Sequence, residues 1–103
     1  MSGTLVRRWP VPPDHAAFAG HFPGRPLLPG VVLLGEVLET ALADPELARA
    51  LGPAPRLAAA KFLAPVGPGS ELELRLVRTD AAVRFEVWLG ARLAASGHFE
   101  RHA

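Results

Sequence analysis

Three consecutive runs in the second half of the sequence alternate apolar and polar residues. Their apolar positions are Leu72, Leu74 and Leu76 in the first run, Val83, Phe85, Val87 and Leu89 in the second, and Leu93, Ala95, Gly97 and Phe99 in the third. A period of two is typical of strands with one buried face. Short connections at Asp80–Ala81 and at Gly90 separate the runs. The pattern therefore predicts an antiparallel meander over residues 71–77, 83–89 and 91–100.

A different pattern occupies residues 31–43. Its apolar residues are Val31, Val32, Leu33, Leu34, Val37, Leu38, Ala41 and Leu42, which nearly encircle a helix. A helix that is apolar on most sides is usually buried on most sides, so we expect a central helix inside the sheet. Asp44 and Pro45 then predict the N-cap and first residue of a short second helix that ends at Leu51, before Gly52.

The remaining segments complete an α+β architecture. Residues 4–11 predict a first strand that the Pro12–Pro13 pair ends. Residues 14–18 predict a single helical turn with Asp14 as its N-cap. The alanine-rich residues 56–64 predict a weaker strand, and residues 65–69 a turn. We expect one strand, a central helix and then an antiparallel sheet folded around it, in a single domain over residues 1–103.

Composition excludes several classes of function. A chain of 103 residues with a net charge of +1 has no basic stripe that would predict nucleic-acid binding. The absence of cysteine excludes disulfides and thiolate chemistry. No apolar run is long enough to span a bilayer or act as a signal, so we expect a soluble cytoplasmic protein without a membrane partner. His98 and His102 do not favour a metal site, His15 is expected to be exposed, and no cofactor is expected.

The chemistry concentrates between Gly20 and Glu39. His21 begins a His-Phe-Pro-Gly motif, and Pro29–Gly30 directly precedes the apolar helix. Free backbone amides at a helix start favour an oxygen that carries negative charge. A nearby histidine can transfer protons near neutral pH. The stretch has the outline of an active site.

The motif and the order of elements resemble the hot-dog fold, and more narrowly the 3-hydroxyacyl-(acyl carrier protein) dehydratases of fatty-acid synthesis and their relatives in aryl-polyene and pigment pathways. The resemblance is closest over residues 21–38. It extends more loosely to residues 61–69, similar to a proline-containing segment that follows the helix in that family.

The resemblance implies roles for individual residues. His21 matches the histidine that moves the C2 proton, and Gly30 matches the glycine whose amide polarises the thioester carbonyl. The family places its acid five residues after that glycine, where this chain has Gly35. Glu36 or Glu39 could replace this acid, or neither could. Phe22, Pro29 and Gly35 are further residues expected at the substrate site.

Three functions follow as expectations. The first is a lyase that removes water from a 3-hydroxyacyl thioester on acyl carrier protein or coenzyme A, as a homodimer. The second is a non-catalytic or half-catalytic subunit that forms a heterodimer with a paralogue supplying the acid. The third is an acyl thioesterase, another chemistry found on the hot-dog fold. Free thiol without enoyl product would indicate the third function.

Overall fold

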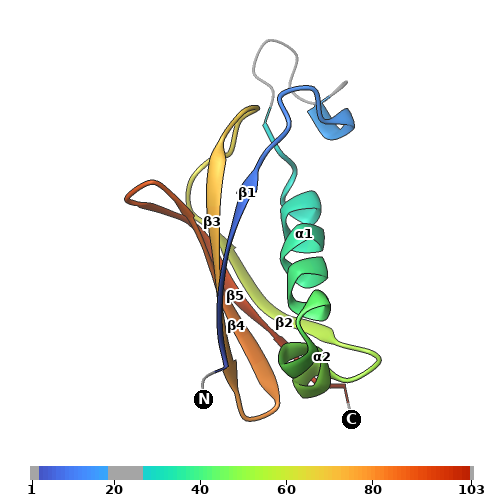
Figure 1. Ribbon diagram of the computed structural model, residues 1–103. Helices are drawn as coiled ribbons and strands as arrows, with labels where there is room; N and C mark the ends of the chain where they lie inside the picture. Colours follow the sequence, from blue (N-terminus) through green and yellow to red (C-terminus); the bar gives the residue numbers. More distant parts are fainter. Residues whose placement is uncertain (1–2, 19–26, 103) are drawn as a thin grey trace.

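The computed structural model describes residues 3–18 and 27–102. The strands in this part of the chain are β1 (Thr4–Pro10), β2 (Arg56–Phe62), β3 (Glu71–Thr79), β4 (Ala82–Leu89) and β5 (Arg92–Glu100). The helices are the 3-10 turn η1 (Ala16–Phe18), α1 (Gly30–Ala43) and α2 (Pro45–Leu51). All five strands form one antiparallel sheet in the order β1-β3-β4-β5-β2. Both α-helices lie on the same side of that sheet (Figure 1).

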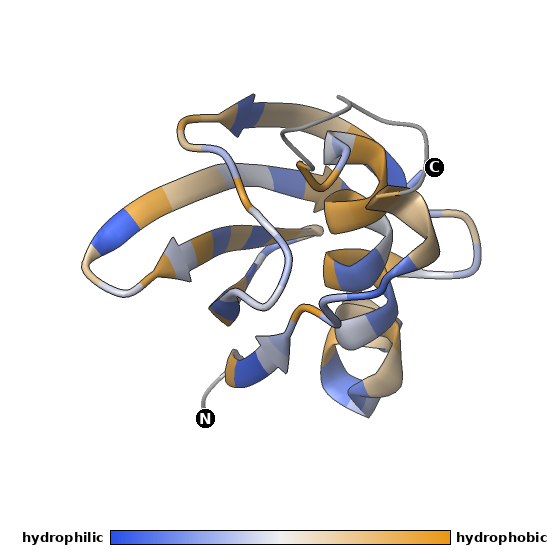
Figure 2. Ribbon diagram, turned by 90° about the horizontal axis from the view of Figure 1, so that it is seen from above, coloured by the Kyte–Doolittle hydropathy of each residue, from blue (hydrophilic) through white to orange (hydrophobic). Residues whose placement is uncertain are grey.

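The predicted meander is confirmed as β3, β4 and β5, which pair in sequence order. Hydrophilic and hydrophobic colours alternate along strands of the sheet, as a half-buried sheet requires (Figure 2). Leu72, Leu74 and Leu76 are buried on β3, and Val83, Phe85 and Val87 on β4. These side chains and those of α1 and α2 form the hydrophobic core between the sheet and the helices.

The third predicted run departs from strict alternation. The pairing of β4 with β5 shifts between Val87, which lies opposite Ala95, and Trp88, which lies opposite Leu93. Ala94 is thus an extra residue, and it is buried beside Ala95. The expectation that Leu93 shares the face of Ala95, Gly97 and Phe99 is therefore wrong. A β-bulge moves Leu93 to the opposite face.

The expectation of a helix buried on most sides is also wrong. Within this chain α1 buries one face, formed by Leu33, Val37 and Ala41. Val31 is 77% exposed and Leu42 is 41% exposed. With the exposed Gly35 these residues are spaced four and seven positions apart, so they form one line along α1, which we call the outer stripe. At roughly 100° per residue this line is centred about 140° around the helix axis from the buried face.

The predicted second helix is confirmed with its caps. The Asp44 carboxylate accepts a hydrogen bond from the Leu47 N–H at 3.1 Å, and Pro45 is the first helical residue. Gly52 follows the helix with a positive φ of 72°. The predicted Asp14 cap of the first turn is wrong, because the acceptor there is His15 Nδ1, which bonds the Ala17 N–H at 3.0 Å.

The strand β2 ends at Phe62, two residues before the expected position. The Leu63 and Ala64 N–H groups both turn toward the Ala94 carbonyl, at 2.8 and 3.2 Å, which ends the regular ladder. None of the helices in the described ranges is of the length and apolar character needed to cross a membrane.

Candidate active site at the start of the central helix

The start of α1 and the segment after β2 together form an apolar groove of about 450 Å³. Its lining residues are Leu27, Leu28, Pro29, Gly30, Leu33, Phe62, Leu63, Ala64, Pro65 and Val66. A backbone hydrogen bond from Leu28 N–H to the Val66 carbonyl, 2.8 Å long, joins the two sides. The two segments that carry the dehydratase resemblance therefore meet at one place.

Backbone donors at the start of α1 border this groove. The N-cap is Pro29, and its side chain cannot accept a hydrogen bond. Its carbonyl accepts from the N–H groups of Val32 and Leu33, at 3.0 and 3.2 Å. Within residues 3–18 and 27–102, no acceptor bonds the N–H groups of Gly30 and Val31. Among the described residues these two donors have no acceptor, and the Gly30 donor lies at the groove, at the positive end of the helix dipole.

The Phe62 ring lies against Gly30. A methyl group added at Gly30 would lie 2.7 Å from Phe62 Cζ, 2.9 Å from Cε1 and 3.1 Å from Cε2. The outer end of the ring therefore rests against the first turn of α1. Sequence reasoning missed this contact, because residues 30 and 62 are far apart in the chain and neither pattern indicates the other.

The three positions considered for the acid differ in environment. Gly35 is exposed, and no described atom beyond its own turn of helix lies within 4 Å of the position its Cβ would take. Glu36 is half-buried, whereas Glu39 is exposed. Neither carboxylate lines the groove at Gly30 within the chain. The predicted His21 and Phe22 lie outside the described residues.

His15 is half-buried, so the expectation of an exposed side chain is wrong. Its ring also meets Phe18 edge to face, with centroids 6.3 Å apart. Burial raises the pKa of the Glu36 carboxyl above the ordinary value of 4.5, and the charge of Glu39 raises that pKa further. A positive charge on His15 lowers it. Glu36 is thus poised to keep its proton longer than a free glutamate.

This shift predicts how stability depends on pH. A raised folded-state pKa means that the folded chain binds the Glu36 proton more tightly than the unfolded chain. The contribution is fully present below about pH 4.5, the unfolded value, and is lost as pH rises through the folded pKa. Relative to Glu36→Gln, the wild-type free energy of unfolding should therefore fall over this window. Urea denaturation at a series of pH values measures it.

Glu39→Gln provides the matched control, because it removes a charge that raises the Glu36 pKa while leaving Glu36 in place. As pH rises, the free energy of unfolding of Glu39→Gln should fall less than that of the wild type and more than that of Glu36→Gln. Parallel curves for the wild type and Glu36→Gln from about pH 4 to pH 7 would contradict the raised pKa.

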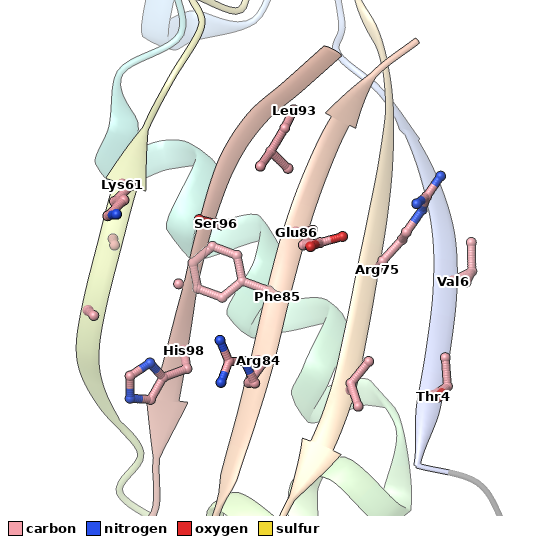
Figure 3. Close-up of a pocket in the computed structure, with 14 residues that line it drawn as sticks. Thr4, Val6, Lys61, Arg75, Arg84, Phe85, Glu86, Leu93, Ser96 and His98 are labelled. Atoms are coloured by element: carbon pink, nitrogen blue, oxygen red, sulfur yellow. The ribbon is translucent and has the colours of Figure 1, made fainter. Parts of the chain in front are cut away.

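A larger groove, about 570 Å³, lies on the opposite face of the sheet, where α1 is seen behind the strands (Figure 3). It contains none of the predicted site residues, and charged side chains from several strands line it. Two of these side chains lie beside acidic neighbours. Arg75 bonds Glu73 at 2.5 Å and stacks over Trp88 at 4.8 Å, and His98 lies 3.3 Å from Glu100. We regard this face as a solvated surface of the sheet despite its larger volume.

The described residues hold no cluster of three potential metal ligands. The groove at Gly30 offers a different kind of site, because an amide donor at a helix start, beside apolar walls, can bind the carbonyl of an acyl group. Such a donor stabilises negative charge that develops on the carbonyl oxygen when a proton leaves the adjacent carbon.

Known proteins share both sequence and fold with this chain. A 3-hydroxyacyl-[acyl-carrier-protein] dehydratase FabZ of Gluconacetobacter diazotrophicus is 37% identical over 79 residues, which cover 69% of this chain and 47% of the relative. The chain therefore matches about half the length of that relative.

Two solved structures have the same fold. The dehydratase heterocomplex ApeI:P from Xenorhabdus doucetiae superposes with a TM-score of 0.78 and 26% identity, over 97% of this chain and 88% of the other. A mutant of the fluoroacetyl-CoA-specific thioesterase FlK gives a TM-score of 0.67 at 16% identity, covering 97% and 90% of the two chains. The second likeness shows the fold alone. The α+β expectation is confirmed as a hot-dog fold.

The family assignment rests on the greater part of the sequence. Residues 2–98 match the ApeI-like family, described as ApeI dehydratase. That range includes the motif loop, α1 and the groove at Gly30. The chain belongs to the ApeI-like dehydratase family of hot-dog proteins.

Proposed function

We propose that the chain removes water from a 3-hydroxyacyl thioester and yields the trans-2-enoyl thioester, with acyl carrier protein or coenzyme A carrying the acyl group. The observation that carries this proposal is the amide donor of Gly30 at the start of α1, which lines an apolar groove formed by both family-like segments. Relatives named as 3-hydroxyacyl-[acyl-carrier-protein] dehydratases support the same chemistry.

The proposed step needs a base, an oxyanion site and an acid. His21 takes the proton from C2, and the released electron pair forms the double bond between C2 and C3 while the bond from C3 to oxygen breaks. The Gly30 N–H donates to the thioester carbonyl, on which negative charge grows. Glu36 or Glu39 gives its proton to the departing hydroxyl group, which leaves as water. Solvent then returns the proton from His21 to the carboxylate.

Glu36 fits the role of acid better than Glu39 does. A general acid must hold its proton at the working pH, and burial raises the pKa of Glu36. Because neither carboxylate lines the groove of its own chain, we propose that the acid acts on the groove of a partner chain. Pro29 supports the groove wall, and Gly35 leaves open space on the outer stripe.

A labelled reverse reaction tests the proton chemistry. Hydration of a trans-2-enoyl thioester in heavy water by the purified protein should give a 3-hydroxyacyl thioester with one deuterium at C2. Mass spectrometry with fragmentation locates the label. Free thiol without hydroxyacyl product would instead favour a thioesterase, and unchanged substrate would contradict the proposal for this chain acting alone.

The two edge strands of the sheet differ in how readily they could pair with a second chain. The edge strand β1 ends in Pro10, and its Arg7 guanidinium bonds the Val6 carbonyl at 3.0 Å, so this edge is blocked in part. The other edge, β2, is alanine-rich and almost wholly exposed. Exposed apolar side chains gather beside it at Leu57 (43%), Phe62 (53%) and Leu63 (56%). We propose that β2 pairs with β2 of a second copy to form a homodimer.

A change at the β2 edge should therefore separate the copies. Leu57→Lys should give the mass of one chain where the wild type gives the mass of two, because a lysine on the joined edge places like charges near each other. Val6→Lys is the matched control on the opposite edge, where the replaced side chain is 49% exposed. Analytical ultracentrifugation measures both masses.

Equal masses for wild type and Leu57→Lys would contradict the β2 pairing. A heterodimer with a paralogue remains the second candidate, and Gly35 at the family's acid position favours it. A wild-type chain that is monomeric alone, and that turns over substrate only after mixing with a second hot-dog chain, would support that alternative over the homodimer.

A further inference from the structure

Phe62 is a large apolar side chain left 53% exposed at the end of β2. Its ring does not join the buried core cluster and instead extends to the first turn of α1. The three atoms nearest to a methyl group added at Gly30 all belong to this ring, from 2.7 to 3.1 Å away. One side of the ring is thus fixed by the chain, and another side is open.

The contact limits the space for a side chain at residue 30. Gly30 is not among the described glycines with positive φ, which are Gly52, Gly69 and Gly90. Its backbone is that of a helix start, which any residue can adopt. A larger residue at position 30 would therefore meet the Phe62 ring, which would have to move to make room.

The ring also borders the proposed binding site. Phe62 and Gly30 line the same groove, so an oxygen held by the Gly30 N–H would lie next to the end of the ring. The carbons next to that carbonyl must then pass along the wall formed by Phe62 and Leu63. A branch at C2 of the acyl group would overlap the Phe62 ring, whereas an unbranched chain would pass beside it.

We propose that Phe62 is a specificity-determining residue, which limits the groove at Gly30 to acyl groups that are unbranched next to the carbonyl. This inference rests on the proposed function, in which the Gly30 N–H binds the thioester carbonyl. It concerns the width of the site and not its chemistry, so binding measurements can test it without turnover.

The test compares two isomeric probes of equal carbon number. They are the hexanoyl and 2-ethylbutanoyl amides of pantetheine, in which an NH replaces the thioester sulfur so that neither reacts. Isothermal titration calorimetry should show wild-type preference for the unbranched probe by about tenfold or more, since a misplaced methylene in a fitted pocket costs about 10–200-fold. Phe62→Ala should reduce that ratio to within about twofold, and Phe62→Leu should give an intermediate ratio.

Val77→Ala is the matched control, because Val77 is 42% exposed on β3 and lies neither in the groove nor on the β2 edge. It should keep the wild-type ratio. A Phe62→Ala variant that weakens both probes equally would overturn the proposal, as would an unchanged ratio. If the wild type shows the preference but never forms enoyl product, the width limit stands while the proposed reaction fails.

A pair of stability measurements tests the packing on which the inference depends. Gly30→Ala should be destabilised because its methyl group would overlap the ring. Adding Phe62→Ala to Gly30→Ala should recover most of the lost stability, since the overlapping atoms are then absent. A double variant no more stable than Gly30→Ala would show that the ring does not occupy this space.

Discussion

Gly97→Ala should destabilise the fold by about 3 kcal/mol or more, the upper end of the range for overpacking. Gly97 lies on β5 opposite Phe85 of β4 and Ala60 of β2. A methyl group there would overlap the Ala59 carbonyl oxygen and lie 2.7 Å from Phe85 Cζ and 3.0 Å from Ala60 Cα. Two of these obstacles are backbone atoms, so no side-chain rotation can relieve them. Urea denaturation followed by circular dichroism measures the loss.

Gly35→Ala is the matched control within the same protein. Gly35 lies inside α1, and no described atom beyond its own turn of helix lies within 4 Å of the added methyl group. In an isolated chain the change should stabilise the helix by up to about 1 kcal/mol, because glycine is a poor helix former. If Gly97→Ala unfolds at the same urea concentration as the wild type, the close approach of β2 to β5 at Gly97 is contradicted.

His21→Gln should lower the rate of dehydration by about 10²–10⁴-fold, the usual contribution of a general base. Glutamine keeps a polar side chain of moderate size but cannot accept the C2 proton near neutral pH. The loss should appear in kcat rather than only in KM, because the amide donors and apolar walls that bind substrate remain. Steady-state kinetics with a 3-hydroxyacyl thioester separates the two parameters.

The two glutamates serve as parallel tests of the acid. Glu36→Gln should lose activity to a similar degree as His21→Gln if Glu36 donates the proton, while Glu39→Gln should retain most of its rate. The opposite ranking would assign the acid to Glu39. Full activity in both variants would exclude either residue as the acid.

The parts of the fold that follow from local pattern were predictable. The strict alternation of leucines with charged residues in β3 identifies a half-buried strand, and Asp44–Pro45 identifies the start of α2. The bulge at Ala94 was not predictable, because two adjacent small apolar residues fit either face of a strand. The sheet order places β1 beside β3 and β2 beside β5, and no local pattern carries that information.

The burial of α1 was misjudged for a physical reason. Its apolar residues outnumber those that one small sheet can cover, so Val31 and Leu42 remain exposed in the single chain. Composition reports how apolar a helix is but not what covers it.

The candidate site was predictable only where a motif marks it. Pro29–Gly30 located the helix start and its free amides. Phe62 packs against Gly30, which is far away in the sequence. His15 lowers the pKa of Glu36 through its charge. For Phe62 the signal was weak but present, since it falls in the 61–69 segment that resembles the family. For His15 the decisive features are its Nδ1 bond to Ala17 and its effect on Glu36, which require the folded chain.

The most direct test of the proposed dehydration is to incubate the purified protein with 3-hydroxyacyl thioesters of several chain lengths and to follow both products by mass spectrometry. We predict loss of one water molecule with the thioester intact, at a rate lower by about 10²–10⁴-fold in His21→Gln. Release of free thiol without enoyl product, or no conversion at any chain length, would contradict the proposal.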